Sequence, residues 1–215
     1  GGIGFDIQET SDFVFEKLQS YGLHPQRMCG TGIVCTIGSG GKTILLRADM
    51  DALPIQEDTG LPFACQNGTA HACGHDMHTA MLLAAAKMLS ETQDELKGTV
   101  KLMFQPAEEA LKGATAMMEA GVLENPKVDA AFAIHVTTGH ENFPTGSIQY
   151  VRGVAFGACD MFRITVKGKE CHGAYPCRGI DPINIGSRIV TATQELVSME
   201  LPATEEAVIT FGKFH

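Results

Sequence analysis

The chain has 215 residues, of which 44% are hydrophobic and 19% are charged, and its formal net charge is −9 at pH 7. This composition is ordinary for a globular protein with a buried core. The Lys and Arg residues are scattered, and the apolar runs are far shorter than the roughly 20 residues that span a bilayer, so neither nucleic acid nor membrane is an expected partner.

The first 136 residues are predicted to alternate between strands and helices. Helical spacing covers 10–18, with Ser11 as a candidate N-cap and Gly22 just beyond the end. Strands are predicted at 33–37 and 43–48, joined by the glycine-rich turn GSGGK as a hairpin, then at 99–104 and 129–136. Helices are predicted at 79–89 and 108–120. Apolar strands separated by helices indicate an α/β fold, with a mixed, largely parallel sheet covered by helices on both faces.

The pattern changes after Gly153. Residues 159–168 and 206–214 alternate like half-exposed strands, and a helix is predicted between them at 181–198. Such a short segment buries too little apolar surface to be stable as a separate domain. We therefore expect two domains, one at 1–152 and part of an α+β unit at 153–215.

The number and spacing of the cysteines indicate the redox state of the cellular compartment. The seven cysteines are an odd number without the spacing of a disulfide framework, which favours reduced thiols. The N-terminus has neither a basic start nor an apolar core, so no signal peptide is expected. These features predict a cytoplasmic protein.

Polar side chains follow three of the predicted strands. Asp49 and Asp51 come after 43–48, Glu108 and Glu109 follow 99–104, and His135 closes the last strand of the series. In an open α/β sheet, ligands gather outside the carboxyl ends of the strands. The sequence therefore predicts that carboxylates and an imidazole meet at one sheet edge.

The octet HACGHDMH (71–78) stands at a predicted helix start and could face that edge. It admits three readings. Short Cys/His tracts bind metal, Cys73 could be a thiol nucleophile with a histidine base, and a polar loop could cap the helix through Asp76. His71 and His75 have the spacing of a helical zinc motif, but Gly74 lies between them and no Glu follows His71.

The remaining polar residues also have two readings each. Glu108 and Glu109 could be solvent-exposed residues in the first turn of a helix. Alternatively, one carboxylate binds metal and its neighbour activates a water. Asp49 and Asp51 are either turn residues after a strand or carboxylates that fix a ligand histidine or the metal pair. His135 is either a core histidine or an imidazole of the polar cluster at the sheet edge, and His172 is either a loop histidine or an oxyanion donor.

Five separated stretches carry a family resemblance: RADMDALP (47–54), HACGHDMHTAMLLAAA (71–86), KLMFQPAEE (101–109) with the later GA (113–114), AIHV (133–136) and KGKECHGAYPCRGIDP (167–182). Together they resemble the metal-dependent amidohydrolase branch of the aminoacylase/carboxypeptidase superfamily. That branch includes hippurate hydrolases, N-acyl-amino-acid amidohydrolases and auxin-conjugate hydrolases. The resemblance implies a zinc-exopeptidase-like catalytic domain followed by the first part of a ferredoxin-like lid or dimerisation domain.

The resemblance also implies roles for individual residues. Four match metal ligands: Cys73, as a bridging thiolate, His75, Glu109 and His135. Glu108 matches the general base and Asp51 the orienting acid. His172 matches a lid histidine that, in dimeric relatives, reaches the neighbouring protomer's site.

The implied reaction is hydrolysis of the amide bond of an N-acyl amino acid by a water activated between two divalent cations. Mixed S/N/O ligands suit zinc, with manganese, cobalt or nickel as alternatives. A homodimer through the lid is implied. The alternatives are a dipeptidase or carboxypeptidase of the same superfamily, or an inactive metal-binding or dimerising fragment. Family members are nearly twice as long as this chain. They have a longer segment before the position of Phe5 and a further ligand histidine that has no counterpart here. An incomplete site is therefore expected.

Overall fold

The computed structural model describes residues 2–138 and 144–215, and the chain divides into two compact units, Gly1–Pro144 and Thr145–His215. Within the described ranges, no helix combines the length and the apolar character that a bilayer crossing requires. The first unit contains the sheet and the candidate site.

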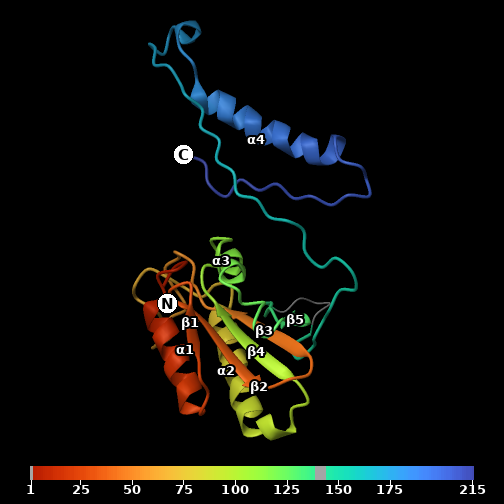
Figure 1. Cartoon of the computed structure of the whole chain (residues 1–215). Coiled ribbons are helices and arrows are strands. Elements are labelled where there is room, and N and C mark those ends of the chain that lie inside the picture. The colour runs from red at the N-terminus through yellow and green to blue at the C-terminus, as the bar shows by residue number, and fades with distance from the viewer. Residues whose placement is uncertain (1, 139–143) are drawn as a thin grey trace. The chain divides into compact units, whose positions relative to one another are not determined.

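The sheet of the first unit has five strands (Figure 1). In chain order they are β1 (Gln26–Met28), β2 (Gly32–Gly38), β3 (Thr43–Asp49), β4 (Thr99–Gln105) and β5 (Ala130–Ala133). Their order across the sheet is β1-β2-β4-β3-β5. β3 runs parallel to both β4 and β5, whereas β2 is antiparallel to β1 and β4. The predicted mixed α/β sheet is therefore confirmed.

The predicted hairpin between β2 and β3 is wrong, because β4 lies between them. The glycine-rich link crosses the start of β4, where Thr99 N–H donates to the Lys42 carbonyl and Thr99 Oγ1 donates to the Gly40 carbonyl. A glycine-rich turn specifies that the chain reverses. It does not specify which strand pairs with which, since that depends on burying apolar side chains on both faces of a central strand.

Helices cover both faces of the sheet, as predicted. α1 (Gln8–Ser20) and α2 (His75–Glu91) lie side by side (Figure 1). Their buried Leu18 and Leu83 join a core with Ile33 of β2. The adjacent Val34 points to the opposite face, where it packs with Met117 of α3 (Gly113–Glu119). A 3₁₀ turn, Gln93–Glu95, follows α2.

Three helix starts differ from the prediction. α2 begins at His75, four residues before the predicted start at 79. α1 begins at Gln8 after Ile7, and Ser11 lies inside it, buried, with its Oγ donating to the Thr31 carbonyl at 2.7 Å. The helix expected from Glu108 begins instead at Gly113. The loop before Gly113 has positive φ angles at Ala107 and Leu111, which interrupt helical geometry.

The second unit contains one long helix, α4 (Pro182–Met199), close to the predicted bounds. Asp181 caps it by accepting the N–H groups of Ile183 and Asn184. The strands expected at 159–168 and 206–214 do not form. A strand needs a ladder partner to satisfy its backbone, and the backbone pairing that the structure places near them is the single bridge Lys169–Ile180, beside the 3₁₀ turn Pro176–Arg178.

Candidate metal centre

The polar residues that follow β3, β4 and β5 meet at the N-terminus of α2. Within the described residues, three groups have potential ligand atoms within 4.8 Å of one another: Cys73–His75–His135, His75–Glu108–Glu109 and Asp49–His75–His78. His75 belongs to all three groups. The site therefore centres on the first residue of α2.

His75 is 1% exposed, and its two ring nitrogens have different surroundings. Nδ1 lies 2.8 Å from the main-chain carbonyl of Asp51. Because a carbonyl only accepts, Nδ1 carries the proton and Nε2 is left with its lone pair. Nε2 is buried without a hydrogen-bond partner, 3.6 Å from Glu109 Oε1 and 3.7 Å from Glu108 Oε2.

The potential around His75 favours a cation. Burial disfavours the charged imidazole, but a hydrogen bond to Asp51 and the charge of Asp49 outweigh burial and raise the pKa of His75. Glu109 Oε1 is also buried without a hydrogen-bond partner. Buried polar atoms are normally bonded, so an unpaired nitrogen lone pair facing an unpaired carboxylate oxygen fits a divalent cation.

Cys73 and His135 form the second part of the cluster. His135 Nδ1 lies 2.6 Å from the Val136 carbonyl, so Nδ1 donates, and Nε2 lies 3.3 Å from Cys73 Sγ. Burial and the negative charges of Glu109 and Glu108 raise the pKa of Cys73 to about 11. A nucleophilic cysteine needs a lowered pKa, so these surroundings argue against the thiol-nucleophile reading. A bound divalent cation would reverse this effect and favour the thiolate.

Asp51 fixes the loop that carries the two glutamates. It is 1% exposed, and its Oδ1 and Oδ2 accept the N–H groups of Glu108 and Glu109 at 2.9 and 3.2 Å. Burial and the charge of Glu109 raise the pKa of Glu108. Neither glutamate is in a helical turn, so the solvated-helix reading of this pair is wrong. One buried carboxylate thus sets the positions of both glutamates.

Asp49 and His78 form a buried dyad beside these residues; a supporting role for each was expected from the sequence, but their pairing was not. His78 Nδ1 lies 2.6 Å from Asp49 Oδ1, and Asp49 Oδ2 lies 2.7 Å from Arg47 Nη1. Burial opposes ionisation of Asp49, but the His78 hydrogen bond and the Arg47 charge outweigh burial and lower its pKa. The i, i+3 spacing of His75 and His78 was the available signal, because it places both rings on one helix face.

His71 and Asp76, the other polar residues of the octet, lie outside the three groups of potential ligands. Gly74 precedes α2 in a left-handed conformation, and Asp76 Oδ1 accepts the N–H of Met77, so Asp76 is not the N-cap. His71 Nδ1 is buried without a hydrogen-bond partner, and burial lowers the pKa of His71.

His172 belongs to the second unit. Its Nδ1 accepts the Ala174 N–H at 3.1 Å, and its exposed ring lies 5.6 Å from that of Tyr175. Within its own unit His172 is therefore a loop residue with local contacts, and its role as an oxyanion donor stays a prediction.

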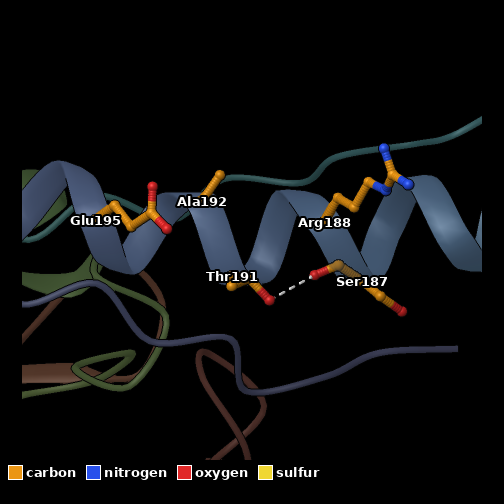
Figure 2. A pocket seen from close by; sticks show the side chains of 5 residues that line it. All are labelled: Ser187, Arg188, Thr191, Ala192 and Glu195. Atoms are coloured by element: carbon orange, nitrogen blue, oxygen red, sulfur yellow. Dashed lines mark hydrogen bonds between the residues drawn. The ribbon is translucent and has the colours of Figure 1, made fainter.

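A hollow of about 380 Å³ also lies on α4 (Figure 2). All five lining residues come from this one helix: Ser187, Arg188, Thr191, Ala192 and Glu195. Ser187 Oγ and Thr191 Oγ1 donate to carbonyls one turn earlier, so both hydroxyls are satisfied within the helix. The hollow lacks the convergent ligand atoms that mark the cluster in the first unit.

The sheet has imidazole and carboxylate groups at the carboxyl ends of its strands, with a thiol just before α2, and this arrangement marks the chain as a candidate metalloprotein. Residues 45–210 match peptidase family M20/M25/M40. The chain belongs to this family.

Two curated relatives and one solved structure are similar to the chain. It is 41% identical over 211 residues to an N-acetyl-L-cysteine deacetylase of Bacillus subtilis (strain 168), covering 96% of this chain and 50% of the relative. It is 40% identical over 217 residues to an N-acyl-L-amino acid amidohydrolase of Geobacillus stearothermophilus, covering 99% and 57%. The chain thus spans about half the length of the curated relatives it matches. The YXEP protein of Bacillus subtilis, described as a dinuclear metal binding peptidase from the M20 family, superposes with a TM-score of 0.60 at 43% identity, covering 63% of this chain and 39% of that one.

Proposed function

We propose that the protein is a metal-dependent amidohydrolase that cleaves the amide bond of N-acyl amino acids. The observation that carries this proposal is the buried, unpartnered Nε2 of His75, which faces the unpartnered Oε1 of Glu109 at 3.6 Å. The names of the two relatives, a deacetylase and an amidohydrolase, support the substrate class.

Four side chains would hold the metal: Cys73, His75, Glu109 and His135. Each histidine directs Nδ1–H to a backbone carbonyl and so presents Nε2, an arrangement that fixes the tautomer of a ligand histidine. The thiol, imidazole and carboxylate donors suit zinc, with manganese, cobalt or nickel as alternatives, and the YXEP likeness supports two ions. When bound, divalent cations polarise a carbonyl and lower the pKa of water.

Glu108 would be the general base. Its side chain is about one-third exposed and its Oε2 lies 3.7 Å from His75 Nε2, so it borders the proposed metal position while remaining open to water. The raised pKa of Glu108 suits a group that takes a proton from the attacking water and passes it to the leaving amine. Asp51 would act through the main chain by holding Glu108 and Glu109 in place.

Residues 153–215 would form part of a lid or dimerisation domain, and 1–152 the metal-binding domain. His172 would stabilise the oxyanion when the lid closes over the site. In a homodimer, the lid that closes would belong to the partner subunit. The odd number of cysteines without the spacing of a disulfide framework supports a reducing, cytoplasmic setting.

A substrate panel tests the proposal in the complete protein. The purified protein, reconstituted with zinc or manganese, is assayed on N-acetyl, N-benzoyl and indole-acetyl amino acids and on dipeptides. We expect amide hydrolysis of the acyl amino acids, loss of turnover on chelation and recovery on adding metal. Preference for dipeptides would assign the peptidase alternative instead. No turnover on any substrate with metal bound would reject the enzymatic function.

A further inference from the structure

Both ring nitrogens of His78 are bonded, and the ring is 2% exposed. Val136 N–H donates to Nε2 at 2.9 Å, and Nδ1 lies 2.6 Å from Asp49 Oδ1. A nitrogen that accepts from an N–H carries no proton, so His78 is the neutral tautomer whose Nδ1–H donates to Asp49. Although His78 belongs to a group with ligand spacing, it has no lone pair left for a metal ion.

Asp49 holds this ring from a rigid position at the end of β3. Its Oδ2 is paired with Arg47, whose Nε donates to Gln105 Oε1 at 2.9 Å. Its main-chain carbonyl accepts the hydroxyl of Thr79 at 2.9 Å. Asp49 is therefore fixed through both its side chain and its backbone, and it fixes the ring of His78 in turn.

The other end of the His78 ring holds the main chain of Val136, the residue directly after His135. The carbonyl of Val136 accepts His135 Nδ1–H, so one residue is held by His78 and orients His135. The two rings are in edge contact, with centroids 4.6 Å apart. A Cβ on Gly74 would lie 2.4 Å from Val136 Cγ2, so only a glycine leaves room for Val136 there.

His135 needs this support because strand pairing does not hold it. β5 ends at Ala133, its residues are exposed, and its ladder with β3 extends only to the Arg47–Ala133 pair. His135 is itself exposed. The hydrogen bond from Val136 to His78 is the point at which this exposed segment is tied to the buried end of α2.

We propose that His78 is a positioning residue that seats Val136 and thereby holds His135 Nε2 beside Cys73 Sγ. The proposal rests on the proposed function in one respect, that His135 is a metal ligand. His78 does not contact the metal; it acts through the backbone N–H of Val136.

Two amide variants separate the two bonds of His78. In His78→Gln, the side-chain Oε1 can accept from Val136 N–H at the former Nε2 position. In His78→Asn, the amide N–H can still donate to Asp49 but the acceptor for Val136 is lost. The complete protein is loaded with Co²⁺, whose visible bands report coordination geometry and whose thiolate charge-transfer band reports Cys73.

We expect His78→Asn to weaken Co²⁺ binding about 10–100-fold, as loss of a ligand's supporting partner does elsewhere, and to alter the visible bands. His78→Gln should stay close to the parent protein. Leu82→Ala, in the apolar core on the same helix, is the control for general loss of packing and should leave the bands unchanged. Equal effects of the Asn and Gln variants, or no effect of either, would overturn the proposal.

A second measurement needs neither a variant nor turnover. In the metal-free protein, ¹⁵N NMR of labelled histidines at pH 7 should show His78 protonated at Nδ1 and unprotonated at Nε2. The opposite tautomer would overturn the proposal. Gly74→Ala, which pushes on Val136 from the other side, should reproduce the Co²⁺ spectrum of His78→Asn. Because these readouts do not use amide hydrolysis, a failed substrate panel and a failed role for His78 are distinguishable.

Discussion

His75 donates its Nδ1–H to the main-chain carbonyl of Asp51 at 2.8 Å, and this bond decides which nitrogen the site can use. With Nδ1 occupied, Nε2 is the only lone pair of the ring, and it faces Glu108 and Glu109. The Asp51 carboxylate sets the other side of the same space by accepting the N–H groups of these two glutamates. Asp51 thus determines both the orientation of the imidazole and the position of the carboxylates.

Replacing Asp51 with Asn should therefore weaken metal binding. The amide offers one acceptor oxygen, so one of the two glutamate N–H groups loses its partner and the loop is freed. We expect metal affinity to fall about 10–100-fold and the protein to lose about 1 kcal/mol of stability, because the N–H left without a partner is partly buried. Metal titration and urea unfolding measure the two effects. Asp58→Asn, on an exposed loop, is the matched control, and equal metal affinity in both variants would contradict the role given to Asp51.

Lys101 is predicted to be a stabilising residue with no part in the chemistry. Its buried Nζ donates to the carbonyls of Val122, Glu124 and Pro126 at 2.9, 2.7 and 2.9 Å. Lys101→Met would leave these carbonyls without a donor, and we expect a loss of about 3 kcal/mol in the free energy of unfolding. Lys97→Met, at an exposed position before β4, should change stability little. Thermal and urea unfolding test this, and an unchanged midpoint for Lys101→Met would refute it.

Asp129 gives a prediction for the acid side of the stability profile. Hydrogen bonds from Lys42 Nζ and the Thr43 N–H, both 2.8 Å, lower its pKa. Because the folded-state pKa lies below the unfolded value of about 4, the ionised carboxylate stabilises the fold above that value. The contribution is lost as the pH falls through the lowered folded-state pKa.

We therefore expect Asp129→Asn to lower stability at pH 7 and to reduce the further loss on acidification. Urea midpoints at neutral and acid pH measure this difference. If the variant and the parent protein showed parallel pH profiles, the bonds to Lys42 and Thr43 would contribute nothing through ionisation.

Much of the fold and of the clustering follows from local patterns. Apolar periodicity predicted α1, α2 and four of the five strands near their observed positions, and the rule that ligands gather at the carboxyl ends of strands predicted the meeting of Asp51, Glu108 and His135. The three-residue β1 was too short to give a pattern. The expected β2–β3 hairpin failed because strand order is decided by burial across the whole sheet.

The start of α3 and the role of His78 could not be predicted because both depend on distant contacts. Glu108 follows an apolar strand and precedes a helical pattern, but Asp51, far back in the chain, holds its N–H in a loop. In the sequence, His78 is one more polar residue of the octet. Its role depends on the hydrogen bonds of its two ring nitrogens with Asp49 and Val136, which only the structure shows. Sequence spacing shows that His75 and His78 share a helix face, but not which nitrogen of each is free.

We propose that Glu108 is the base and Glu109 a ligand of a metal-dependent amidohydrolase. The most direct measurement is metal content and turnover, side by side, for Glu108→Gln and Glu109→Gln in the complete protein. We predict that Glu108→Gln abolishes turnover with full metal content, whereas Glu109→Gln loses metal and activity together. Loss of metal in Glu108→Gln, or substantial turnover in that variant, would contradict the account.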